Sequence, residues 1–170
     1  WSNLLWSIAT AQVEMELEEV LVYVAHLLET FPGYANLFKP QELSNTLWAI
    51  AKLLSNKAAK ESMTTSEEEA ALRVFRILLR TLIPQPSRCQ PQVLSNSIWA
   101  MATLGFGMEN DQALMIETVR SIIDAAIPRL DTFRPQELSN LAWSLGRLVV
   151  DVPVLANLDT VLHRIGYELA

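Results

Sequence analysis

Hydrophobic and polar residues recur along the chain with the period of an α-helix. In the segment that begins at Pro40, apolar residues follow one another at intervals that keep them on one helical face: Leu43, Leu47, Ile50 and Leu54. The other side of the wheel, roughly 140° to 200° away, carries polar and aromatic residues: Gln41, Asn45, Trp48 and Lys52. Proline has no amide hydrogen to leave unpaired in a first turn, so the pattern predicts a helix that begins at Pro40.

The same phrase occurs four times. Residues 40–53 return as 91–104 and as 135–148, and residues 1–10 are the same phrase without its front, so we expect the chain to begin inside a repeat. One asparagine marks each copy, at spacings of 42, 51 and 44 residues: Asn3, Asn45, Asn96 and Asn140. Such spacings are typical of repeats built from two helices. We name the helix of each phrase an A helix.

A second periodic segment follows each A helix, and we name it the B helix. The B helices are expected at roughly 13–30, 67–83, 111–127 and 154–169. Acidic residues at the front of the second and arginines toward its end suit the helix dipole. A proline and a connector of nearly constant length follow each complete B helix, whereas a polar insertion between Ser55 and Ser66 lengthens one turn from A to B.

These patterns predict an all-α fold, an α-solenoid of stacked antiparallel helix pairs. About four repeats are expected, the first one incomplete, at approximately 1–38, 39–89, 90–133 and 134–170. They form a single solenoid domain over residues 1–170, with the right-handed stacking that is the general habit of such arrays.

The polar and aromatic face of the A helices has two interpretations. In the structural one, tryptophans fill the wedge between neighbouring repeats and asparagines bridge unpaired backbone groups. In the functional one, the face lines a groove where amides, indoles and basic side chains contact single-stranded nucleic acid or an extended peptide. Both interpretations can apply to the same face. The residues expected to stack on neighbouring repeats or on a ligand are Trp6, Trp48, Trp99 and Trp143.

The phrase Pro-Gln-Glu-Leu-Ser-Asn-x-Leu-Trp-Ala-x-Ala-Lys-Leu resembles the first helix of octotricopeptide repeat proteins and of related repeat proteins abundant in algal and protist organelles. The resemblance covers essentially the whole chain. It implies paired-helix repeats that bind single-stranded organellar RNA or ribosomal RNA in a mitochondrion or plastid. Carried over position by position, the RNA- or ligand-binding candidates are Gln41, Asn45, Lys52, Gln92, Asn96, Thr103, Gln136, Asn140 and Arg147.

A second resemblance supports an alternative function. Residues 138–145 are similar in wording to armadillo helices, in which tryptophan and asparagine hold an extended peptide, although Trp143 follows Asn140 here rather than preceding it. The alternative is therefore a protein-interaction scaffold, or a peptide-binding subunit of an organellar assembly.

The charge distribution bears on the choice of partner. The chain has 13 Lys and Arg against 19 Asp and Glu, a net charge of −6, which by itself argues against binding to a phosphate backbone. In the A helices and the residues just before them, basic side chains nevertheless outnumber acidic ones. A weakly basic groove on an acidic body is therefore compatible with RNA, with a modest electrostatic share of the affinity.

The sequence shows no constellation of residues that indicates catalysis. Cys89 is the single cysteine and has no motif around it, so we expect an inert thiol in a reducing compartment. His26 and His163 are far apart in the sequence. Arg73, Arg76 and Arg80 share one face of a B helix, where they fit either a solvated stripe paired with the preceding glutamates or a contact with phosphate. The longest apolar stretch is too short to cross a bilayer. We expect no catalytic residue, metal, cofactor or small-molecule substrate, no membrane insertion, and hence no enzyme.

Overall fold

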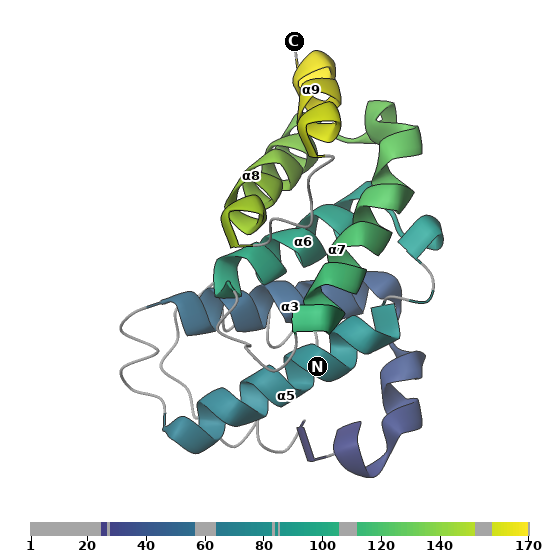
Figure 1. The fold of residues 1–170 in the computed structure, drawn as a ribbon. Helices are drawn as coiled ribbons and strands as arrows, with labels where there is room; N and C mark the ends of the chain where they lie inside the picture. The colour runs from purple at the N-terminus through teal and green to yellow at the C-terminus, as the bar shows by residue number, and fades with distance from the viewer. Residues whose placement is uncertain are drawn as a thin grey trace. The chain divides into compact units, whose positions relative to one another are not determined.

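The computed structural model describes residues 25–26, 28–56, 64–82, 84, 86–105, 112–151 and 158–169. Every regular element among them is a helix, and no strand occurs in these ranges, so the predicted all-α class is confirmed (Figure 1). The α-helices are α3 (Pro40–Ser55), α5 (Thr65–Leu82), α6 (Pro91–Leu104), α7 (Gln112–Ala126), α8 (Pro135–Asp151) and α9 (Leu158–Leu169). The 3₁₀-helices are η1 (Pro32–Leu37), η2 (Pro86–Arg88) and η4 (Ile127–Thr132).

The A helices begin where the sequence predicts, with proline in the first turn of α3, α6 and α8. In α3 the backbone N–H of Lys39 donates to Glu42 Oε2 at 2.8 Å, and in α8 that of Arg134 donates to Glu137 Oε2 at 2.8 Å. A carboxylate three residues into a helix thus satisfies a backbone donor in front of it and complements the positive end of the dipole.

The connectors before the three described A helices share one backbone turn. In each, the N–H of the residue two positions before the opening proline donates to a carbonyl three residues earlier: Phe38 to Ala35 at 3.3 Å, Cys89 to Pro86 at 3.0 Å and Phe133 to Leu130 at 3.0 Å. The residue directly before the proline is extended where its angles are given, as at Lys39 and Gln90, because proline disfavours helical backbone in front of it. The nearly constant connector length is thus accompanied by the same turn in all three connectors.

The chain divides into two compact units, Trp1–Pro84 and Gln85–Ala170. In the first unit, α3 and η1 pack against α5. The apolar stripe expected on α3 is buried together with the apolar face of α5, which includes the fully buried ring of Phe75. The α5 helix begins with a reciprocal cap in which Thr64 N–H donates to a Glu67 carboxylate oxygen and Thr64 Oγ1 accepts from the Glu67 N–H.

In the second unit, α6 packs against both α7 and α8, and α9 packs against α8 (Figure 1). The core includes Ile98 and Met101 of α6 and Met115 of α7, none of which is exposed. Arg129 of η4 joins its own connector to the connector that contains η2, because its guanidinium donates to the Pro86 carbonyl at 3.3 Å. The same guanidinium donates to the Ala125 carbonyl at the end of α7 at 2.9 Å. From α3 to α9 the A and B helices alternate in the predicted order, whereas the expected first A helix and most of the first B helix, predicted at 13–30, lie outside the described residues. The solenoid and the single domain over residues 1–170 stay predictions.

Burial of the A helices extends beyond the apolar stripe that the sequence marks. Small and hydroxyl-bearing residues on both sides of that stripe are also buried, among them Ser44, Thr46, Ala49 and Ala51 of α3. Several of these hydroxyls donate to a carbonyl four residues earlier in their own helix, such as Thr46 to Glu42 at 2.9 Å and Ser97 to Val93 at 2.7 Å. The side chains are thereby satisfied without a partner from another helix, so they suit a close helix–helix contact.

Candidate ligand-binding face of the A helices

In the first unit, the four candidate residues of α3 interact in two pairs. Gln41 Nε2 donates to Asn45 Oδ1 at 2.9 Å, and Lys52 Nζ lies 4.8 Å from the ring centroid of Trp48. Each pair is separated by four positions, which places its members one above the other on the helix surface. All four side chains are partly exposed. The face therefore presents an amide pair followed by a cation over an indole.

In the second unit, candidate residues from two A helices meet. The rings of Trp99 in α6 and Trp143 in α8 stack with centroids 6.2 Å apart and planes 29° apart. Arg147 lies over Trp143 of its own helix, with Cζ 5.7 Å from the ring centroid, and its Nε donates to the carbonyl of Ala102 at 2.7 Å. That carbonyl belongs to the last turn of α6, where helix carbonyls lack intrahelical partners, so Arg147 also caps α6.

The remaining candidates of this unit differ in exposure. Gln92 and Gln136 are exposed, and Asn96 and Asn140 are partly exposed. Within the part of the chain that the structure describes, neither asparagine amide has a hydrogen-bond partner. Thr103 is partly exposed as a residue, yet its Oγ1 is buried without a partner among the described residues. Trp6 and Asn3 lie outside the described residues.

The contact between Arg147 and the Ala102 carbonyl was not anticipated from the sequence. Arg147 stands at the phrase position of Lys52 and Thr103, and this position alone suggests an outward charge. A hydrogen bond to a residue of another helix depends on how the two helices pack, and no local pattern encodes it.

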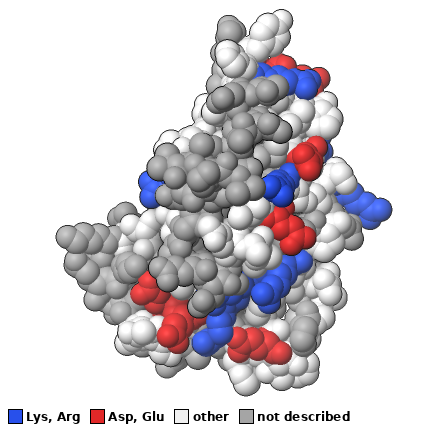
Figure 2. All heavy atoms as spheres, in the orientation of Figure 1, with Lys and Arg blue, Asp and Glu red and all other residues white. Residues whose placement is uncertain are grey.

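Acidic and basic groups lie next to one another on the face drawn in Figure 2. One such pair in the first unit is Arg73 and Glu29, whose Nε and Oε1 atoms are 3.0 Å apart at the surface. Exposed pairs of this kind contribute little to stability, about 0–1 kcal/mol. They also reduce the positive potential that a phosphate backbone would meet near α5.

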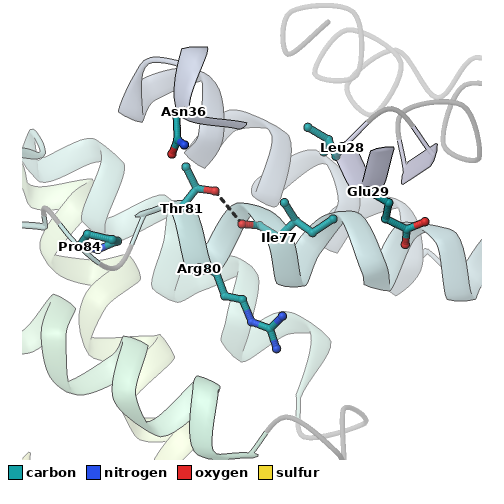
Figure 3. A pocket seen from close by; sticks show the side chains of 7 residues that line it. All are labelled: Leu28, Glu29, Asn36, Ile77, Arg80, Thr81 and Pro84. Atoms are coloured by element: carbon teal, nitrogen blue, oxygen red, sulfur yellow. Dashed lines mark hydrogen bonds between the residues drawn. The ribbon is translucent and has the colours of Figure 1, made fainter. Parts of the chain in front are cut away.

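The first unit has an open pocket of about 440 Å³ between η1, α5 and the helical residues before η1 (Figure 3). Its polar groups do not converge on one point. Thr81 Oγ1 donates to the Ile77 carbonyl of its own helix at 2.8 Å, and Figure 3 shows Arg80 directed away from Asn36 and Thr81. With Glu29 already paired to Arg73, the described residues that line the pocket form no assembled set of ligand-binding groups.

The Cys89 thiol is buried at the position that Phe38 and Phe133 occupy in the other two connectors. Burial raises its pKa above the ordinary value, and the positive charge of Arg129 opposes part of that rise. Such a thiol stays protonated near neutral pH, whereas nucleophilic cysteines need the thiolate. His26 and His163 are exposed, and the described residues contain no group of three or more His, Cys, Asp or Glu side chains that could hold a metal ion.

Comparison with known proteins found no matching family model, no similar curated protein and no similar solved structure. Among the described helices, none combines the length and the apolar character required to cross a bilayer.

Proposed function

We propose that the chain is an α-solenoid protein that binds single-stranded RNA, organellar or ribosomal, along the outward face of its A helices. The observation that carries the proposal is the state of Asn96 and Asn140. Both amides stand at the same position of the repeated phrase, both are partly exposed, and neither has a partner in the described part of the chain. An amide that holds no structural hydrogen bond is available to pair with the edge of a base.

The surroundings of these amides suit unpaired bases. The stacked Trp99 and Trp143 rings and the Arg147 guanidinium provide planar surfaces beside the amides. Stacking of a base on an aromatic side chain contributes about 1–3 kcal/mol, and the amide then reads an edge that a duplex would hide. The resemblance to octotricopeptide repeats supports the same class of ligand and a mitochondrial or plastid location.

Filter binding or fluorescence anisotropy with single-stranded RNA over a salt series tests this function. We expect Asn96→Ala with Asn140→Ala to weaken binding about tenfold or more, because each lost amide removes roughly 1 kcal/mol of hydrogen bonding. The melting temperature should stay unchanged, since the two amides make no hydrogen bond within the described part of the chain.

Arg120→Ala, a change at an exposed position of the B helix α7, is the matched control and should leave affinity unchanged apart from a small salt-dependent effect. Absence of affinity for single strands at low salt, or equal affinity for a duplex, would contradict the proposal.

A protein-interaction scaffold is the second candidate, and the contacts of Trp99 and Arg147 favour it. Both side chains already join α6 to α8, so they stabilise the stack whether or not a nucleic acid is present. A pull-down in which ribonuclease leaves the recovered partners unchanged would support this candidate over RNA binding.

A further inference from the structure

The α6 and α8 helices carry the same phrase, but one side of it is buried in α6 and open in α8. On α6 this side holds Ser95 and Ala102, both 0% exposed. The equivalent residues of α8 are Ser139 and Gly146, and both are exposed. We name this side, together with the tryptophan beside it, the receiving flank. Its tryptophan is partly buried in α6, whereas Trp143 of α8 is 48% exposed.

The structure shows what covers the receiving flank of α6. Helix α8 contacts α6 on this side, as the Trp99–Trp143 stack and the hydrogen bond from Arg147 to the Ala102 carbonyl demonstrate. Small side chains there allow the two helices to approach closely.

The opposite side of α8, which we name the docking flank, holds Leu141 and Ser144, both 0% exposed. The hydroxyl of Ser144 donates to the Asn140 carbonyl of its own helix at 2.6 Å, so the docking flank requires no polar partner from another helix when it is covered.

We propose that the open receiving flank of α8 binds a helix of a partner polypeptide that presents the docking flank of this same phrase. The α6–α8 contact is the template, because the receiving flank is nearly the same in both helices and its occupant is known in one of them. The interface would continue an existing one and cover the exposed Trp143 indole as α8 covers part of Trp99. This inference goes beyond RNA binding and does not depend on it.

The space on α8 is suited to such a helix. A side chain added at Gly146 would meet no atom within 4 Å, so nothing in the described chain fills this side. Ser139 donates to the Pro135 carbonyl of its own helix at 2.8 Å and leaves no unsatisfied hydroxyl when it is covered. Neither residue carries charge, so docking on this flank removes no ion from water.

The probe for the test is a synthetic peptide with the sequence of α8, residues 135–151, held helical by a side-chain staple away from its docking flank. We expect saturable binding of the labelled peptide to the full chain, measured by fluorescence anisotropy. A control peptide with glutamate at the positions of Leu141 and Ser144 should bind at least tenfold more weakly, because its docking flank is charged.

Two variants of the chain locate the binding site. Ser139→Gln with Gly146→Gln places two long side chains on the receiving flank and should weaken peptide binding tenfold or more. The matched control, Ser139→Ala with Gly146→Ala, keeps the flank as small as it is in α6 and should bind within about twofold of the unchanged chain. Both substituted positions are exposed, so we expect both variants to fold, as thermal melting would verify.

Three results would overturn the proposal. The first is failure of the unchanged chain to bind the stapled peptide, and the second is equal peptide binding by the glutamine and alanine variants. The third is self-association of the unchanged chain that is lost in the glutamine variant, because it would identify a second copy as the occupant. RNA affinity should be the same in the alanine variant as in the unchanged chain, because alanine adds neither charge nor a long side chain next to Asn140 and Trp143. The two proposals can therefore fail separately.

Discussion

The α6 and α8 helices of the second unit form a natural comparison, since they share a phrase and differ in their neighbours. Helix α6 has α7 on one side and α8 on another, and even its small residues Ser95 and Ala102 are fully buried. Helix α8 keeps the corresponding residues exposed and presents an indole to solvent. The phrase therefore encodes three packing surfaces, and a given helix uses as many of them as it has neighbours.

The largest expected effect comes from placing one side chain in both environments. Ala102→Gln forces a long polar side chain between α6 and α8 and should lower the free energy of unfolding by about 3 kcal/mol. Gly146→Gln at the equivalent position should instead raise it by about 0.5–1 kcal/mol, because the site is open and glutamine favours the helix more than glycine does. Chemical denaturation measures the free energy of unfolding of each variant. A change in the same direction for both variants would contradict the comparison.

The tryptophans should show the same contrast at smaller scale. Trp99→Ala removes a ring that is partly buried and contacts α8, and should cost about 2–3 kcal/mol. Trp143→Ala removes a ring that is 48% exposed and should cost about 1 kcal/mol. Urea unfolding provides the two values. A larger loss at Trp143 would show that burial does not rank the two positions.

Substitution of Arg147 tests the hydrogen bond that joins α8 to α6. Arg147→Gln removes the donor to the Ala102 carbonyl and the cation over Trp143, and should destabilise by about 1 kcal/mol after allowance for solvent exposure. Arg134→Gln is the matched control, because Arg134 is exposed and its guanidinium Nε is 4.0 Å from its nearest carboxylate oxygen. We expect Arg134→Gln to change thermal stability by less than half of the change caused by Arg147→Gln.

The smallest expected effect is the pH dependence from Cys89. Burial raises the pKa of this thiol, so above about pH 8.5 the unfolded chain loses a proton that the folded chain retains. Stability from this group is therefore fully present below the unfolded pKa and is lost as pH rises through the folded value. Melting temperatures from pH 7 to 10 should fall slightly more steeply for the unchanged chain than for Cys89→Ala. Identical slopes would indicate that the thiol titrates normally.

Much of the fold follows from the sequence. The helix starts at Pro40, Pro91 and Pro135 are local events, because proline and the residue before it restrict the backbone regardless of distant neighbours. The apolar stripe on α3 is equally local, since helical spacing alone places its leucines and isoleucine on one face. The side-by-side placement of Gln41 with Asn45 and of Trp48 with Lys52 follows from their four-residue separation.

Other features of the candidate face depend on packing between helices. The sequence places Trp99, Trp143 and Arg147 on the outward side of their helices, but the stacked rings and the bond to the Ala102 carbonyl exist because α8 lies against α6. The Asn96 and Asn140 amides likewise have no hydrogen-bond partner among the described residues because of how the neighbouring helices are placed.

Three features follow from the order of residues alone, because they depend on bonds and spacings within one helix: the helical character of the chain, the starts of its A helices and the apolar face of each. The burial of Ser95 and Ala102 and the exposure of Ser139 and Gly146 depend on how the helices pack, since small residues are compatible with either environment. Such a surface is buried only where another helix packs against it.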